Sequence, residues 1–482
     1  MSWASSAVEL PLILGLVILS TLSLNLLALT LGRLLAPRRA HGPPSNAGAG
    51  DTPDVLVQLP LYNEGPLVER VLRAVAALDW PRDRLLVQVL DDSTDGSLAF
   101  SRAAVAHWKA EGLRVELVHR TRRTAYKAGA LAAGLERSNA PFVAIFDADF
   151  VPPPDFLRRT VPLLLGAPRL ALVQARWTHL NADESILTRV QARLLDGYFG
   201  VEQVARARWG LPVPFNGTCG IWRRAAIADA GGWQGDTLTE DLDLSLRTQL
   251  RGWHAAFLPE LHVPGALPNS ARAWRVQQFR WTKGFVQCFR KLVRPVWASP
   301  HLRWWQKLAV TLQLGQPLAF LVGLLCLLLG LPFIAGEATA GPLLTVVAVS
   351  TSTLGFVGTF GFLAASLERP IRGRHFGEMV AALILTSGLL LSNARGAFEA
   401  LAGHQSEFVR TPKTLAANRP RGRDRMPYGL PELAAGIGLL GFGIAEQPAT
   451  VPFLAIVIGG LVGFGAMQML DGRRIAWVQT SR

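Results

Sequence analysis

Residues 142–149 read Phe-Val-Ala-Ile-Phe-Asp-Ala-Asp, and residues 85–93 read Leu-Leu-Val-Gln-Val-Leu-Asp-Asp-Ser. Each stretch is a short apolar run that ends in aspartates. Runs of this length, bounded by turn or cap residues, predict buried strands. The predicted strands are Val55–Leu59, Leu85–Leu90, Val115–Val118 and Phe142–Phe146, and the helical patterns between them are Val68–Leu78, Leu98–Glu111 and Tyr126–Arg137. Strands that alternate with helices predict a parallel, Rossmann-like α/β sheet.

Two acidic clusters follow strands of this predicted sheet. Asp91-Asp92-Ser93 follows one strand and Asp147-Ala148-Asp149 follows another. Ligands of open α/β sheets bind outside the carboxyl ends of the strands, so both clusters are expected to face one cleft. Carboxylate oxygens suit Mg²⁺ or Mn²⁺, which bridge substrate phosphates. The alternative is that these aspartates cap the next helix, which is our interpretation of Asp95 and Asp155.

Three further groups are candidates for chemistry. Lys127 opens a predicted helix, where its charge and the helix N-terminus would favour a diphosphate. Thr239-Glu240-Asp241 precedes the amphipathic helix Leu242–Arg251, so it is either a capping sequence or a general base. The stretch Gln277-Gln278-Phe279-Arg280-Trp281 lies in the basic, aromatic segment 274–294. That segment predicts an interfacial helix, in which Arg280 would grip phosphate and Trp281 would stack on a sugar.

The composition favours a membrane protein. Half of the 482 residues are hydrophobic and 17% are charged, while the net charge is +14. We found no zinc-finger spacing, basic helix or RNA-binding motif, so nucleic acid is not an expected partner. Basic residues flank apolar segments, which indicates anionic lipid instead. Cys219, Cys288 and Cys326 are too few and too scattered for a disulfide framework or a zinc cluster.

The apolar runs predict five membrane spans and one interfacial helix. The predicted spans are Leu10–Leu31, Leu308–Phe333, Pro342–Ser366, Leu430–Ala445 and Val451–Leu470. The run Met379–Leu391 has 13 residues, too short for a span of about 20 residues. If it lies in the interface, the basic loops at 369–374, 410–425 and 473–474 all fall in the cytosol, as the positive-inside rule requires. The N-terminus is then outside.

Taken together, these residues resemble the membrane-embedded, inverting glycosyltransferases of family 2, in the cellulose synthase and glucomannan (mannan) synthase branch. The family pattern is an Asp, a D-x-D, a T-E-D and a Q-x-x-R-W, and all four occur here in order. Supporting similarities lie at Pro60–Glu64, Tyr126–Leu131, Phe215–Thr218 and Ala230–Trp233. The resemblance covers residues 55 to about 413 and implies a GT-A nucleotide-sugar domain inserted between transmembrane helices.

The resemblance also implies an organisation and a set of roles. The implied segments are an N-terminal span (1–40), a linker (41–54), the GT-A domain (55–270), interfacial helices (271–305), two spans (306–375), an interfacial helix with a gating-like loop (376–429), and two spans with a short tail (430–482). Nucleotide-sugar contacts are implied for Tyr62, Glu64, Asp91, Asp92, Lys127, Asp147, Gln277, Gln278 and Arg280. Acceptor contacts are implied for Trp281, Gly217, Thr218 and Cys219. Asp147 and Asp149 would hold the metal, and Asp241, with Glu240 beside it, would be the catalytic base.

Phe408-Val-Arg-Thr-Pro-Lys413 resembles the gating loop of cellulose-type synthases, with Phe408, Thr411 and Lys413 over the donor. Arg421 and Arg425 have the spacing of a cyclic-dinucleotide motif, but no β-barrel sequence follows, so we interpret them as membrane-surface charge. Gln313 and Gln316, inside an apolar span, either line a glycan path or form ordinary helix–helix hydrogen bonds.

The expected function is polymerisation of hexose from UDP-glucose or GDP-mannose into a β-linked, 1,4-type glycan that crosses a bacterial inner membrane. The expected partners are the sugar donor, the growing glycan and the bilayer; an accessory export subunit is left open. One alternative is a non-processive enzyme with a ceramide- or polyprenyl-phosphate-type acceptor. Another is a transporter with an inactive nucleotide-sensing domain.

Overall fold

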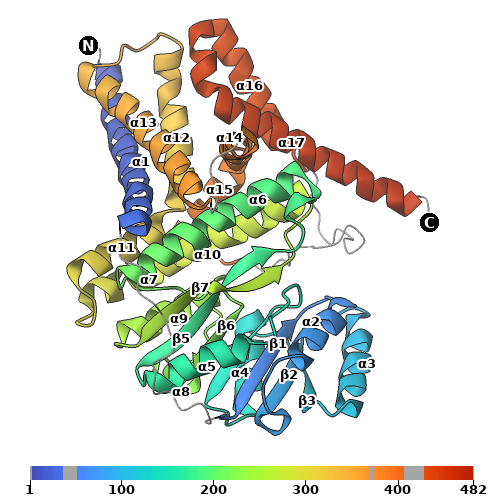
Figure 1. The fold of residues 1–482 in the computed structure, drawn as a ribbon. Coiled ribbons are helices and arrows are strands. Elements are labelled where there is room, and N and C mark those ends of the chain that lie inside the picture. Colours follow the sequence, from blue (N-terminus) through green and yellow to red (C-terminus); the bar gives the residue numbers. More distant parts are fainter. Residues whose placement is uncertain (1–2, 36–51, 368–372, 407–427, 481–482) are drawn as a thin grey trace.

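The protein is described here by a computed structural model that covers residues 3–35, 52–367, 373–406 and 428–480. A mixed α/β domain lies at one end and a bundle of apolar helices at the other (Figure 1). Two long helices, α6 (Ile186–Gly197) and α10 (Ala271–Ala298), lie between these layers. The predicted gating-like residues Phe408, Thr411 and Lys413, with Arg421 and Arg425, lie outside the described residues.

The domain is built on a seven-stranded sheet of order β3-β2-β1-β4-β6-β5-β7. The strands are β1 (Val55–Leu61), β2 (Leu85–Asp91), β3 (Val115–His119), β4 (Phe142–Ile145), β5 (Leu170–His179), β6 (Gly220–Arg223) and β7 (His254–Gly265). All four predicted strands are present within three residues of their expected ends. They are parallel, as predicted. The prediction does not hold for β6, which runs antiparallel to β4 and to β5, because an apolar run shows burial but not strand direction.

Helices cover both faces of the sheet. They are α2 (Leu67–Ala76), α3 (Ser97–Ala110), α4 (Tyr126–Glu136), α5 (Phe156–Gly166), α7 (Val204–Arg208), α8 (Arg224–Asp229) and α9 (Glu240–Leu250). Strand β1 shows how two cores form: Val55, Val57 and Leu59 pack with α2 and α5, whereas Leu56 packs on the α4 side. A strand buried on both faces reads as a continuous apolar run, which is why the sequence identified it.

The chain order places one point of the sheet where a ligand is expected. From β1 the chain moves to β2 on one side, while β4 pairs with the other side of β1. Neighbouring parallel strands whose connections run in opposite directions form a topological switch point, and the crevice outside their carboxyl ends is the usual ligand site. The predicted acids lie at these ends.

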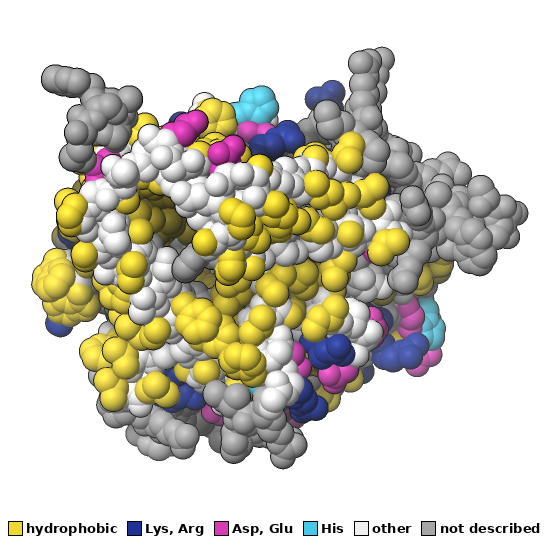
Figure 2. Space-filling view, turned by 90° about the horizontal axis from the view of Figure 1, so that it is seen from above, with side chains coloured by type: hydrophobic (Ala, Val, Ile, Leu, Met, Phe, Trp, Pro, Cys, Tyr) yellow, Lys and Arg dark blue, Asp and Glu magenta, His cyan; other side chains and the backbone are white. Residues whose placement is uncertain are grey.

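The helical layer contains α1 (Trp3–Leu35), α11 (Trp304–Gly315), α12 (Leu318–Ile334), α13 (Pro342–Ala365), α14 (Gly373–Ser387), α15 (Leu390–Leu401), α16 (Leu430–Glu446) and α17 (Val451–Thr480). Within the part of the chain that the structure describes, three helices are long and apolar enough to cross a membrane by themselves: Val8–Leu35, Pro342–Ala365 and Leu454–Asp471. Viewed from above, this end of the molecule is mostly hydrophobic, with charged side chains near its rim (Figure 2).

Two predicted elements differ from the structure. The expected span Leu308–Phe333 is bent by 62° between α11 and α12, and the expected interfacial helix Met379–Leu391 straddles a 52° bend between α14 and α15. The first bend falls at Gln316-Pro317, where proline interrupts helical hydrogen bonding. Counting each bent pair as one span gives up to five spans among the described residues. These five include the α14–α15 pair and leave out the predicted span Leu430–Ala445, so they differ from the predicted five in one member. The predicted set of spans therefore stays a prediction.

Candidate functional site

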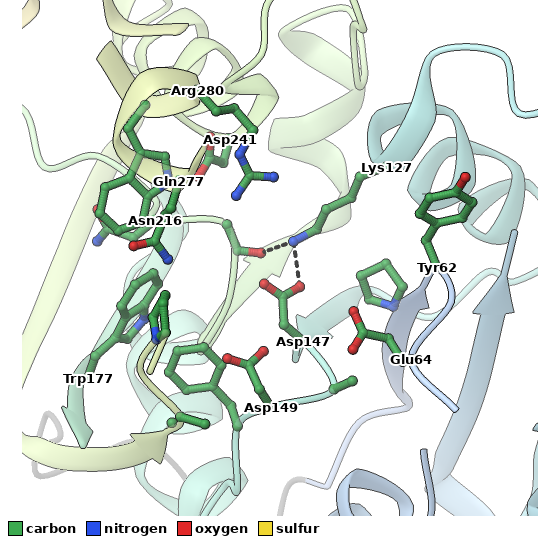
Figure 3. A pocket seen from close by; sticks show the side chains of 18 of the residues that line it. Tyr62, Glu64, Lys127, Asp147, Asp149, Trp177, Asn216, Asp241, Gln277 and Arg280 are labelled. Atoms are coloured by element: carbon green, nitrogen blue, oxygen red, sulfur yellow. Dashed lines mark hydrogen bonds and ion pairs between the residues drawn. The ribbon is translucent and has the colours of Figure 1, made fainter. Parts of the chain in front are cut away.

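A cleft opens at the switch point, outside the carboxyl ends of β1, β2 and β4. Its walls come from segments that lie far apart in the sequence. The predicted residues that line it are Tyr62, Glu64, Asp92, Lys127, Asp147, Asp149, Gly217, Glu240, Asp241, Gln277, Arg280 and Trp281. Figure 3 shows Lys127, Asp147 and Arg280 directed toward one space, with Tyr62 and Glu64 on the far side. The structure therefore brings the four predicted motifs to one place.

The acids after β4 are held in a network. The Lys127 ammonium donates to Oδ1 of Asp147 at 2.6 Å and to the Gly217 carbonyl at 2.9 Å. The Asp147 backbone N–H donates to the Thr218 hydroxyl at 2.8 Å. Burial alone would lower the pKa of Lys127, but the charges of Asp147 and Glu240 raise it above its usual value. Lys127 therefore stays protonated and positively charged beside the acids.

At the other end of the cleft, Asp92 and Asp91 behave differently. Asp92 lines the cleft and accepts two hydrogen bonds from Arg120, the one from Nε being 2.9 Å long. Asp91 is fully buried and accepts from the Ser93 backbone N–H at 2.8 Å and from the Ser101 hydroxyl. Asp91 therefore fixes the turn that presents Asp92, and it does not line the cleft itself.

Tyr62 presents its ring to the Arg123 guanidinium, whose carbon lies 3.4 Å from the ring centroid. Arg123 also lines the cleft. Burial lowers the pKa of Arg123, although the nearby Tyr62 and Asp92 oppose that shift. A planar cation on an aromatic face makes a rigid wall at this end of the cleft.

Asp241 stands in the first turn of α9, deep in the cleft. Thr239 precedes this helix but makes no side-chain cap; its hydroxyl lies 3.4 Å from the Cys288 sulfur. The Thr239 side chain therefore does not cap the helix, whereas Glu240 and Asp241 do lie in its first turn, as the capping interpretation expects. Burial and the neighbouring Glu240 raise the pKa of Asp241 to about 7, and burial raises the pKa of Glu240. A carboxyl group that ionises near neutrality is suited to general-base chemistry.

Gly217 leaves the space that Asp241 occupies. Its φ is +82°, and a β-carbon built on it would lie 2.9 Å from Oδ2 of Asp241. Only glycine adopts this conformation without strain. The predicted acceptor residues Thr218 and Cys219 are fully buried behind Gly217. They line neither the cleft nor the cavity next to it. Thr218 instead holds the backbone of Asp147.

Helix α10 supplies the wall opposite the sheet. Gln277, Arg280 and Trp281 reach the cleft, whereas Gln278 lines only a neighbouring cavity. Burial lowers the pKa of Arg280, and the charges of Glu240 and Asp147 counteract that shift. Figure 3 shows its guanidinium beside Asp241 and Lys127. Two cations thus face the space above Asp147 and Asp149.

The neighbouring cavity, called here the aromatic cavity, shares Asp241, Asn216, Gln277, Trp177 and Trp281 with the cleft. Its other walls are largely aromatic and are formed by Tyr198, Phe199, Phe215, Trp274 and Phe285. It extends to Thr386 at the end of α14 and to Leu389 before α15. The aromatic cavity therefore connects the cleft with the helical layer.

Sequence reasoning missed several residues of these two cavities. Arg123, Trp177, His179 and Tyr198 line one or both of them but belong to none of the predicted motifs, and Asn216 lies in the stretch Phe215–Thr218 without having been given a role. The only available signal was position: Trp177 and His179 end β5 at the same edge of the sheet as Asp149.

Gln313 and Gln316 line neither of these cavities. Gln313 donates to Glu202 at 3.2 Å, and Gln316 accepts from Asn25 at 3.4 Å. These contacts match the expectation of hydrogen bonds between helices. Neither residue therefore supports a glycan path in this structure.

Comparison with known proteins gives the same class as the motifs. Residues 53–284 match the family described as glycosyltransferase like family 2. A glucomannan 4-beta-mannosyltransferase 2 of Arabidopsis thaliana is 45% identical over 267 residues, which are 55% of this chain and 50% of the relative. A probable glucomannan 4-beta-mannosyltransferase 4 of Oryza sativa subsp. japonica is 37% identical over 330 residues, 64% of this chain and 60% of the relative. The chain thus spans about half the length of these curated relatives.

Residues 53–284 are therefore a family 2 glycosyltransferase domain, homologous to plant glucomannan 4-beta-mannosyltransferases. Among solved structures, a mannosyltransferase of Pyrobaculum calidifontis in complex with GDP-Man and Mn²⁺ has a TM-score of 0.52 and 23% identity. The match covers 79% of this chain and 99% of the archaeal one. This similarity confirms the predicted GT-A-type fold.

Proposed function

We propose that the protein is a membrane-bound, inverting glycosyltransferase that adds mannosyl residues from a nucleoside diphosphate sugar to a β-1,4-linked glycan. The observation that carries this proposal is the place of Asp241, where the charged cleft and the aromatic cavity meet. A donor in the cleft and a sugar end in the aromatic cavity would approach the same carboxylate. The names of the plant relatives favour mannose as the transferred sugar.

The chemistry would be a single displacement. Asp241 accepts the proton of the acceptor hydroxyl while that oxygen forms a bond to the anomeric carbon. The bond between this carbon and the diphosphate oxygen breaks on the opposite face, so an α-linked donor gives a β-linked product. The nucleoside diphosphate leaves with the bonding electrons. Lys127 and Arg280 would bind its negative charge.

Asp147 and Asp149 are the residues that would hold Mg²⁺ or Mn²⁺. Among the described residues no group of three or more His, Cys, Asp or Glu side chains could hold a metal by itself. Two carboxylates still fit, because Mg²⁺ is usually held by one or two carboxylates together with substrate phosphates and water. When bound, the ion supplies Lewis-acid stabilisation of the leaving diphosphate. Since Lys127 holds Oδ1 of Asp147, that residue would offer its second oxygen.

The aromatic cavity would receive the growing glycan. Trp177, Trp274 and Trp281 give flat apolar faces for sugar rings, and Asn216 offers an amide that accepts from Tyr198 at 2.7 Å. The cavity reaches Thr386 and Leu389 in the helical layer, which supports release of the chain toward a membrane. We propose that the protein lies in a bacterial inner membrane with its α/β domain on the cytosolic side, where the positive-inside rule puts the basic loops.

The purified protein should release nucleoside diphosphate from GDP-mannose in the presence of Mg²⁺ or Mn²⁺, and not in the presence of a chelator. UDP-glucose serves as the parallel donor. The product should be a polymer that a β-1,4-specific mannanase degrades. Release without any divalent cation would contradict the proposed metal role. A product carrying one added sugar would establish the lipid-acceptor alternative instead.

A further inference from the structure

Helix α10 has a second face that the proposed reaction does not use. One face carries Gln277, Arg280 and Trp281 to the cleft. The other packs against α15, which lies beside α10 in Figure 1. The residues of this second face are Phe279, Lys283, Val286 and Arg290, spaced by four, three and four positions. This spacing follows one side of a helix and defines what we call the α15-facing stripe.

The partners of the stripe on α15 have matching spacing. A β-carbon at Gly396 would lie 3.2 Å from the Phe279 ring, so the two helices are in close contact there. Val286 packs in one cluster with Ala397 and Ala400. Small residues on one helix and larger ones on the other let the two helices pack closely.

An ion pair between fully buried Lys283 and largely buried Glu399, whose side chain is 16% exposed, lies at the centre of the stripe. The Lys283 side chain has no exposed surface, and its ammonium lies 2.7 Å from Oε2 of Glu399 on α15. The ammonium also donates to the Ser406 hydroxyl. The other carboxylate oxygen of Glu399 accepts from Arg395 at 2.7 Å. Lys283 lies only two positions beyond Trp281 on the same helix. The point on α15 at which Lys283 is held therefore sets the position of Arg280 and Trp281 along the α10 axis.

Burying such a pair is a poor way to stabilise a protein. Removing two charges from water costs about as much as their attraction returns, and apolar residues of similar volume are often equally stabilising. The best-attested benefit of a buried polar pair is a fixed register between helices, because a displaced helix would leave both charges unpaired. An apolar stripe alone tolerates sliding by a turn, about 5.4 Å.

We propose that Lys283 is a positioning residue whose ion pair with Glu399 fixes the axial register of α10 on α15. In this register Arg280 meets the donor diphosphate and Trp281 lies between the cleft and the aromatic cavity. The inference rests on the proposed function for its catalytic readout. Its structural content, the register of two helices, can be measured separately.

The main test replaces both charges with apolar residues in Lys283→Met/Glu399→Leu. We expect the melting temperature in detergent to stay within about 3 °C of the parent. Because Arg280 moves with the register, donor affinity should fall together with turnover and product length, and turnover should fall by at least about tenfold, since one decade is the effect of about 1.4 kcal/mol in positioning. Lys283→Arg keeps the charge and should retain at least half of the parental turnover.

A matched control is a second buried ion pair between the domain and the helical layer, Arg193 on α6 with Glu378 on α14 at 2.9 Å. The double variant Arg193→Met/Glu378→Leu removes a pair of similar burial without touching α10. It should leave product length unchanged. If both double variants lost turnover and stability to the same extent, Lys283 would be an ordinary structural residue and the proposal would be wrong.

The register is read without enzyme activity from spin labels at Arg294→Cys on α10 and Phe398→Cys on α15, two exposed positions. The distance distribution should broaden or move by several ångströms in the apolar double variant and stay narrow in Lys283→Arg. An unchanged distribution would overturn the proposal even if activity fell. Failure of the parent to release nucleotide would count against the proposed function alone, because the label distances do not depend on it.

Discussion

The cleft and the aromatic cavity share Asp241 but are built in different ways. The acids Glu64, Asp92, Asp147 and Asp149 of the cleft follow β1, β2 and β4, so short loops and one sheet topology place them, and α10 adds Arg280 from the opposite side. The aromatic cavity takes its walls from α6, β5, α10 and α14, which meet only through long-range packing. Under the proposed function, binding of a charged donor would thus depend mainly on local geometry, whereas binding of a neutral glycan would depend on the fit of distant helices.

The largest expected effect tests the residue common to both cavities. Asp241→Asn removes the base but keeps the shape, so turnover should fall about 10²–10⁴-fold. Nucleotide affinity, measured by calorimetry, should change little, because Lys127 and Arg280 remain. Asp243→Asn, whose carboxylate pairs with Arg247 and Lys291 instead, is a control for changes in the charge of α9. Parental turnover of Asp241→Asn would remove it as the base.

The next effect belongs to the cleft alone. Asp149→Ala removes a proposed metal ligand, so the metal-dependent part of nucleotide affinity should vanish and turnover should fall about 100-fold. Acceptor KM should stay near the parental value. Asp155→Ala, an exposed acid six residues further on, should change neither. Equal loss of donor and acceptor binding would mean that the two cavities are not separate sites.

A pH profile tests how far the shared carboxylate is buried. The pKa of Asp241 is raised from 3.8 to about 7, so the base is mostly protonated at pH 6 and mostly ionised at pH 8. Its ionised fraction changes about tenfold over this range, and kcat/KM at low donor concentration should rise by that factor. The rise should disappear from the residual activity of Asp241→Asn. A flat profile in the parent would contradict the raised pKa.

The same shift has a consequence for stability. The pKa of Asp241 is higher in the folded state than in the unfolded state. Between about pH 4 and pH 7 the carboxyl group therefore ionises in the unfolded chain first, and the free energy of unfolding falls as pH rises. Asp241→Asn should therefore melt several degrees higher than the parent at pH 8, and little differently at pH 4. A lower melting temperature at pH 8 would show that the carboxylate is stabilised by contacts that burial does not describe.

The smallest effect belongs to the aromatic cavity. Phe285 lines this cavity and not the cleft, so Phe285→Leu should raise the KM for an oligosaccharide acceptor about threefold, the worth of one aromatic contact. Donor KM should not move. Phe289→Leu is the matched control on the same helix, since Phe289 packs against the same apolar cluster as Phe285 but lines neither cavity. A change in donor KM alone would contradict the division between cavities.

The same contrast explains what the sequence could predict. Aspartates at the ends of apolar runs located the cleft, because a parallel sheet brings such ends together whatever the rest of the chain does. Trp177 and Asn216 could not be found this way, because their place depends on antiparallel β6 and on packing against α10. The bends at Gln316 and between α14 and α15 were missed for a similar reason, since hydropathy measures apolar length but not direction.

Helix α10 begins inside the region that matches the family and ends outside it. The family match stops at residue 284, but the helix runs from Ala271 to Ala298, about 42 Å. Its first turn is held by the carboxylate of Asp471 on α17, which accepts from the Ala271 backbone N–H at 2.7 Å. A soluble fragment cut at the family boundary would therefore sever this helix and lose the support for Arg280 and Trp281. Under the proposed function, extension of a glycan would therefore require the intact polypeptide in lipid or detergent.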